Sequence, residues 1–94
     1  MEGAGQTRWQ ARPPDKIVWR EVGDEIVILD LRTSLYWTLN GSATVLWSAL
    51  IKGATTSEMV QRLVDEFDVD AEKAARDVDA FLESCQAQDM VEPT

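Results

Sequence analysis

The sequence predicts an α+β fold in which a three-stranded antiparallel sheet precedes three helices. Two β-branched, apolar runs at 16–22 and 25–31 are separated only by Gly23 and Asp24, and an aromatic run follows at 35–39. Beyond residue 40, apolar residues recur at helical spacing in three segments. Because 94 residues supply one hydrophobic core, we expect a single domain in which the sheet lies against the helices.

The first two strands are expected at residues 16–22 (KIVWREV) and 25–31 (EIVILDL), joined by a tight hairpin turn. Side chains alternate along a strand, so Val27, Leu29 and Leu31 share one face of the second strand. We expect the face of Val27 and Leu29, opposite Ile26, Ile28 and Asp30, to be the core side. The third strand, residues 35–39, places Leu35, Trp37 and Leu39 on one face.

The first helix is expected over residues 41–52, with Asn40 as its N-cap and Gly53 as its end. The second begins after Thr55 or Thr56, has Glu58 in its first turn and stops near residue 68. Asp70 caps the third helix, whose broad apolar face comprises Ala71, Ala74, Ala75, Val78, Phe81, Leu82 and Cys85. Residues 89–91 then return as a short extended piece.

Residues 1–15 contain two adjacent prolines and no apolar period, so we interpret them as a flexible N-terminal arm ahead of a domain at 16–92. No apolar run approaches the roughly 20 residues that span a bilayer, and the N-terminus lacks the order of a secretory signal. These features and the single cysteine favour a cytoplasmic protein. The net charge of −8 disfavours nucleic acid as a partner and favours a basic peptide.

The sequence lacks most of the residues and motifs that catalysis and metal binding usually require. Histidine is absent, which removes the usual general base and the commonest zinc ligand. Cys85 has no second cysteine to pair with and falls at helical spacing from Val78 and Phe81, so we expect a buried structural thiol. The glycines form no phosphate-binding motif, and the acidic stretch 65–72 lacks the glycine of a calcium loop. We therefore expect neither enzyme activity nor a cofactor or metal.

The run LYWTLN at 35–40, the pair Leu46-Trp47, and Gly53, Thr55 and Glu58 at their spacing resemble the family of the pyrroloquinoline-quinone (PQQ) biosynthesis chaperone, PqqD. The resemblance covers about residues 16–92. It implies a winged-helix-turn-helix-like domain that recognises the leader of a ribosomally made precursor peptide, adding it antiparallel to the third strand and packing it on the third helix.

Similar free-standing domains serve lasso-peptide pathways beside a leader peptidase and a cyclase, and their leaders often carry a Tyr-x-x-Pro motif. The resemblance therefore implies a leader peptide and these enzymes as partners. A chaperone or adaptor of another such pathway, or of PQQ synthesis, remains an alternative. So does a scaffold that activates an enzyme without peptide specificity. A winged-helix DNA-binding regulator is disfavoured, because residues 70–89 carry only Lys73 and Arg76 against six acids.

The residues themselves also favour strand addition. An edge strand offers unpaired backbone groups to another strand, and residues 35–39 contain no charge or proline to block such pairing. Trp37 suits a groove or the core equally, while Asp77, Asp30 and Glu83 could attract leader lysines or be ordinary surface charges. The expected peptide-binding residues are Val27, Leu29, Leu35, Tyr36, Trp37, Thr38 and Leu39 on the sheet, and Ala74, Asp77, Val78, Phe81 and Leu82 on the third helix.

Overall fold

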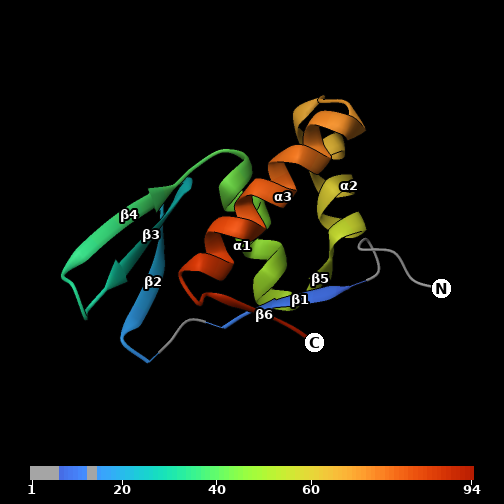
Figure 1. Cartoon of the computed structure of the whole chain (residues 1–94). Coiled ribbons are helices and arrows are strands. Elements are labelled where there is room, and N and C mark those ends of the chain that lie inside the picture. The colour runs from blue at the N-terminus through green and yellow to red at the C-terminus, as the bar shows by residue number, and fades with distance from the viewer. Residues whose placement is uncertain (1–6, 13–14) are drawn as a thin grey trace.

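The computed structural model describes residues 7–12 and 15–94, which form two small sheets and three helices (Figure 1). The larger sheet has the order β2 (Ile17–Val22), β3 (Glu25–Asp30) and β4 (Leu35–Leu39), all antiparallel. Three helices follow it: α1 (Ser42–Lys52), α2 (Thr56–Phe67) and α3 (Ala71–Ala87). The predicted α+β architecture, with a three-stranded antiparallel sheet ahead of three helices, is confirmed.

The β2–β3 hairpin turns at the predicted place. Val22 pairs with Glu25, so Gly23 and Asp24 alone form the loop, and Gly23 has a φ of 63°. A positive φ at the first of two loop residues is the reason that glycine is favoured there. The ladder continues to the pair Ile17 and Asp30, and β3 pairs with β4 from Ile26 opposite Leu39 to Asp30 opposite Leu35.

The expectation that Val27 and Leu29 face the core is wrong. Ile26 and Ile28 are 1% and 2% exposed, whereas Val27 and Leu29 are only half-buried on the other face of the sheet. Both faces of β3 are apolar, so alternation alone did not choose between them. The ladder decides it, because Ile28 pairs with both Trp19 and Trp37 and therefore shares their side of the sheet.

Two of the three predicted helix caps are present. Thr55 Oγ1 accepts from the Glu58 backbone N–H at 3.1 Å while Glu58 Oε1 accepts from the Thr55 N–H at 2.8 Å, which is a complete capping box. Asp70 Oδ1 accepts from the backbone N–H of Lys73 at 2.8 Å. The prediction of Asn40 as the cap of α1 is wrong, because Gly41 occupies that position with a φ of 57° and no side-chain cap is present.

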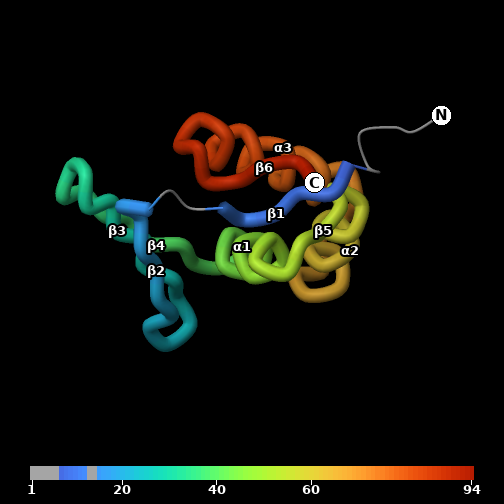
Figure 2. Tube along the Cα trace, turned by 90° about the horizontal axis from the view of Figure 1, so that it is seen from below, coloured from blue at the N-terminus to red at the C-terminus, as the bar shows by residue number. Residues whose placement is uncertain are grey.

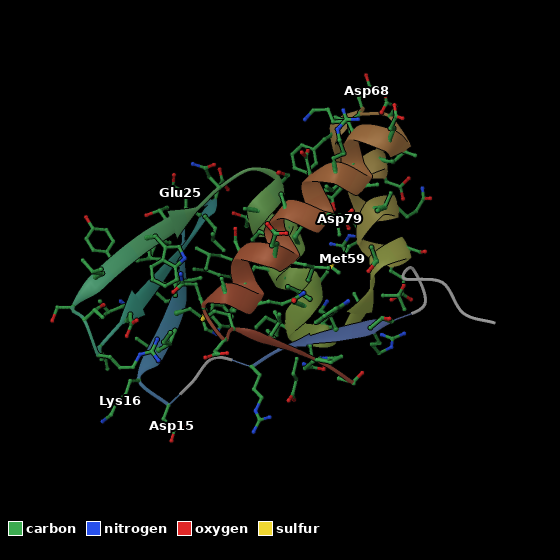
Figure 3. All side chains as sticks on the ribbon, in the orientation of Figure 1. Asp15, Lys16, Glu25, Met59, Asp68 and Asp79 are labelled. Atoms are coloured by element: carbon green, nitrogen blue, oxygen red, sulfur yellow. The ribbon has the colours of Figure 1, made fainter. Side chains whose placement is uncertain are left out.

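The helices and the inner face of the larger sheet enclose one core. All three helices contribute buried side chains to this core. Those of α2 are Met59, which is labelled in Figure 3, and Leu63. Its fully buried large side chains are Trp47, Ile26, Ile28, Leu46, Leu50, Met59, Leu63, Met90 and Val78.

A second sheet was not predicted. In it, β1 (Arg8–Ala11) lies between β5 (Ala54–Thr55) and β6 (Val91–Pro93), antiparallel to both, across the ends of the helices (Figure 2). The expectation of a flexible arm over residues 1–15 therefore does not hold for Arg8–Ala11, and residues 1–6 and 13–14 of that arm lie outside the described part of the chain. Backbone bonds from Arg12 N to Met90 O at 2.7 Å and from Thr94 N to Arg8 O at 2.8 Å extend the ladder.

Trp9 is the residue of β1 that tests whether this strand stabilises the domain. Its side chain is half-buried and packs against the core, so we expect Trp9→Ala to lower the free energy of unfolding by about 2 kcal/mol. Arg12→Ala is the control, because the Arg12 side chain makes an exposed ion pair with Glu92 among the described residues, and its loss should change stability by less than about 1 kcal/mol. Urea unfolding measures both, and equal stability of Trp9→Ala and the wild type would show that β1 does not contribute.

Candidate functional site

A groove runs between β4 and the C-terminal half of α3, and two adjoining cavities form it. The deeper cavity, of about 230 Å³, is lined by Ile28, Trp37, Leu39, Ala43, Trp47, Phe81, Ser84, Cys85, Gln88 and Met90. The outer cavity, of about 520 Å³, is lined by Asp30, Thr33, Leu35, Trp37, Ser84, Ala87 and Gln88. Trp37, Ser84 and Gln88 border both cavities, so they form one continuous surface, here called the β4–α3 groove.

One wall of the groove is a free sheet edge. β4 pairs with β3 on one side, and within the described residues no strand pairs with its other side. The side chains of Leu35, Trp37 and Leu39 alternate into the groove, whereas Tyr36 and Thr38 point to the opposite face of the sheet. The free edge can therefore offer backbone hydrogen bonds while alternate side chains form the floor beside it.

The predicted sheet residues divide between the two faces. Leu35, Trp37 and Leu39 line the groove, but Val27 and Leu29 lie on the far face of the sheet, where they line a different cavity with Val18 and Arg20. The predicted pocket between Val27, Leu29 and the third helix is therefore absent from the structure. Tyr36 is 69% exposed on that far face, next to Leu29.

The predicted α3 residues divide along the helix. Phe81 lines the groove, whereas Ala74 and Val78 are completely buried in the core and leave no room beside them for a ligand ring. Leu82 is 5% exposed and faces the side of the molecule where Trp9 lies. Asp77 is half-buried and pairs with Lys73 Nζ at 3.2 Å.

The sequence interpretation missed the groove residues on the last turns of α3, because it placed the site too near the start of the helix. The C-terminal turns of α3 lie nearer the larger sheet than its first turns (Figure 1). Spacing from Phe81 could have identified them, since positions three, four and seven later share its side of the helix. The missed residues are Ser84, Cys85, Ala87 and Gln88 on α3, with Ala43 and Trp47 on α1 and Met90 after α3.

Trp47 brings an unpaired hydrogen-bond donor to the deeper cavity. Its side chain is fully buried, and its ring meets that of Trp19 edge to face at a centroid distance of 6.0 Å and an interplanar angle of 83°. Its indole Nε1 has no hydrogen-bond partner among the described residues. A buried donor without a partner costs about 1–3 kcal/mol.

Two further groups set the chemistry of the groove walls. Burial raises the pKa of the Cys85 thiol to about 11, so it is a neutral apolar wall at pH 7, and the predicted buried thiol is confirmed. Asp30 is buried at the outer end, where it accepts bonds from Arg32 Nε and the Arg32 backbone N–H at 2.9 Å and from Nη2 at 3.0 Å. The side-chain bonds from Arg32 hold the pKa of Asp30 below its usual value.

The described residues contain no group of three or more histidine, cysteine or acidic side chains placed to hold a metal ion. No helix in this part of the chain is long and apolar enough to cross a membrane.

Comparison with known proteins identifies the class to which this fold and groove belong. The family model for coenzyme PQQ synthesis protein D (PqqD) matches residues 25–91, so the chain belongs to the PqqD family. A comparison with curated proteins found no match.

Two solved structures are similar to this chain over nearly its whole length. The complex of TbiB1 with the TbiA(beta) leader peptide is 29% identical in sequence, with a TM-score of 0.75 over 88% of this chain and 94% of that one. Lasso peptide synthetase B1 complexed with the leader peptide is also 29% identical, with a TM-score of 0.75 over 90% of this chain and 98% of that one. The chain therefore resembles leader-binding recognition elements of lasso-peptide biosynthesis.

Asp30 makes the outer end of the groove sensitive to acid. Because its pKa is lowered in the folded protein, its carboxylate stabilises the fold fully above the unfolded-state pKa of about 4, and this contribution is lost as pH falls through the folded-state value. Asp30→Asn should therefore be less stable than the wild type at pH 7, with a stability gap that narrows as the pH falls below about 4.

Urea unfolding at a series of pH values measures that gap. Asp79→Asn is the matched control, because Asp79 is an exposed carboxylate of α3 without an ion pair among the described residues (Figure 3). A gap for Asp30→Asn that stays constant with pH would contradict the role given to the Arg32 pair.

Proposed function

We propose that this chain binds the leader segment of a ribosomally made precursor peptide as an additional strand on the free edge of β4. The observation that carries the proposal is the apolar β4–α3 groove, which lies along the unpaired edge of a strand that has no charge or proline. Main-chain bonds to β4 would supply affinity, and the two cavities would select side chains. Membership of the PqqD family and the two similar leader complexes support this function.

The shape of the groove favours a leader with bulky side chains two residues apart. Trp37 borders both cavities, and alternate residues of an added strand are about 7 Å apart, so two leader side chains would lie on either side of its ring. The deeper cavity exceeds the roughly 150 Å³ that accommodates a benzene ring. We propose that it takes the aromatic ring of a Tyr-x-x-Pro leader.

The predicted residues then contribute in three ways. Leu35, Trp37, Leu39 and Phe81 contact leader side chains, together with the newly located residues of the last turns of α3. Tyr36 and Thr38 contribute through the strand backbone. The remaining predicted residues support the site from the core or the far face of the sheet, and they are Val27, Leu29, Ala74, Asp77, Val78 and Leu82.

We further propose that the bound leader is presented to a leader peptidase and a cyclase of lasso-peptide biosynthesis, with this chain as a non-catalytic adaptor. A tethered precursor has a raised effective concentration at the enzyme, so an adaptor needs no chemistry of its own. The net charge of −8 would speed association with a basic leader, chiefly at low ionic strength.

Titration of a fluorescently labelled Tyr-x-x-Pro leader peptide tests the groove. Trp37→Ala should weaken binding at least tenfold, about 1.4 kcal/mol, because the ring borders both cavities. Ser84→Trp should have a similar effect by filling the groove from an exposed position without removing a core contact. Tyr36→Ala is the matched control, since it removes a neighbouring aromatic side chain from the opposite face, and binding should change less than threefold.

Circular dichroism would establish that each variant is folded, and duplex DNA at the same concentrations should give no saturable signal. Saturable binding that all three variants retain would contradict the groove, and no leader binding by the folded wild type would contradict the function.

A further inference from the structure

The face of the larger sheet that points away from the helices carries a continuous apolar surface. Leu29 lies between Val18 and Tyr36 in the ladder, and Val27 lies between Arg20 and Thr38. A cavity of about 400 Å³ is lined by Val18, Trp19, Arg20, Val27 and Leu29. Figure 1 shows this sheet at one side of the molecule with the helices grouped on the other side. We call the side chains of Val18, Arg20, Val22, Glu25, Val27, Leu29, Tyr36 and Thr38 the outer face.

Exposed apolar side chains are concentrated on this sheet. Among the described residues, the large apolar side chains with the greatest exposure are Val18, Val22, Leu31, Leu35, Tyr36 and Phe67, and all but Phe67 belong to the sheet or its turn. Val18, Val22 and Tyr36 are on the outer face and are 47%, 52% and 69% exposed. Scattered apolar residues need no explanation, but contiguous ones commonly mark an interaction surface.

The charge on the outer face is unusual for this chain. Six of its nine basic residues form ion pairs with acids, whereas Arg20 is exposed and makes no ion pair with a described residue. It lies within the apolar rows between Val18 and Val22. Glu25 is on the same face but lies at its margin, opposite Val22 at the turn of the β2–β3 hairpin (Figure 3). A complementary partner would therefore present apolar side chains around a carboxylate.

We propose that the outer face docks the enzyme that processes the leader-bound precursor, through an apolar surface that places a carboxylate against Arg20. This inference rests on the proposed leader-binding function. It gives β4 two roles, because Trp37 faces the leader groove while the adjacent Tyr36 faces the enzyme. The leader and the enzyme are then separated by the thickness of one sheet, and neither competes for the surface of the other.

The size of the face indicates a transient contact. Three strands of about six residues cover roughly 14 by 20 Å, an outline of roughly 280 Å², which is small beside the roughly 800 Å² of accessible surface that each partner buries in a standard stable interface. A stable dimer of this chain through the same face is disfavoured for that reason, whereas an enzyme tethered through the bound precursor needs little direct affinity. An anionic membrane is disfavoured by the net charge of −8.

The test is reconstituted leader removal, with the purified cognate leader peptidase, the full precursor peptide and increasing amounts of this protein. Arg20→Glu and Val18→Asp should require at least tenfold more protein for half-maximal stimulation, while their affinity for the labelled leader stays within twofold of the wild type. Lys52→Glu is the matched control, because Lys52 is another basic residue without an ion pair in the described structure but lies at the end of α1, and it should stimulate as the wild type does.

Wild-type stimulation by both outer-face variants would overturn the proposal. So would a wild-type dimer in sedimentation that Val18→Asp dissociates, or binding to phosphatidylserine vesicles that Arg20→Glu abolishes. Failure of the proposed function itself would be distinct, because the wild type would then fail to bind the labelled leader at all.

Discussion

The register of β3 between β2 and β4 is the constraint on which the rest of the structure depends. It aligns Ile28 with Trp19 and Trp37 and so directs the isoleucines of β3 onto the helices. A slip of one residue would exchange the two faces and turn Val27 and Leu29 inward. The same register decides which side chains of β4 enter the groove and which remain on the outer face. The ion pair of the buried Asp30 with the partly exposed Arg32 stabilises this arrangement at the turn that leads into β4.

The groove lies where the last turns of α3 face β4. The first turns of α3 complete the core through Ala74 and Val78, and its last turns line the groove beside β4. Phe81 and Cys85 form an apolar wall there, with the neutral thiol held protonated by burial. An edge strand and a helix that approach without packing tightly leave space for one extended peptide, so the binding surface follows directly from the layout of the fold.

The sequence was informative where structure is set locally. The hairpin at Gly23, the caps at Thr55 and Asp70 and the three helices were all predictable, because each depends on residues within a few positions. The second sheet was not, since β1 pairs with segments more than 40 and 80 residues away and carries no hairpin signal. The groove was predicted in outline, on β4 and α3. Its position along α3 depends on how the helices and the sheet pack, which the hydrophobic periodicity of the sequence does not show. Both faces of β3 are apolar, so the alternation of its side chains could not identify the face that is buried in the core.

Leader binding as an added strand on β4 is the central claim, and amide hydrogen exchange across residues 35–39 tests it most directly. Alternate amides of an edge strand point to solvent and exchange freely, whereas a new antiparallel neighbour would bond them. Saturating leader peptide is expected to slow exchange at alternate residues of β4, with smaller changes at the last turns of α3. Unchanged exchange along β4, with protection confined to other surfaces, would contradict it.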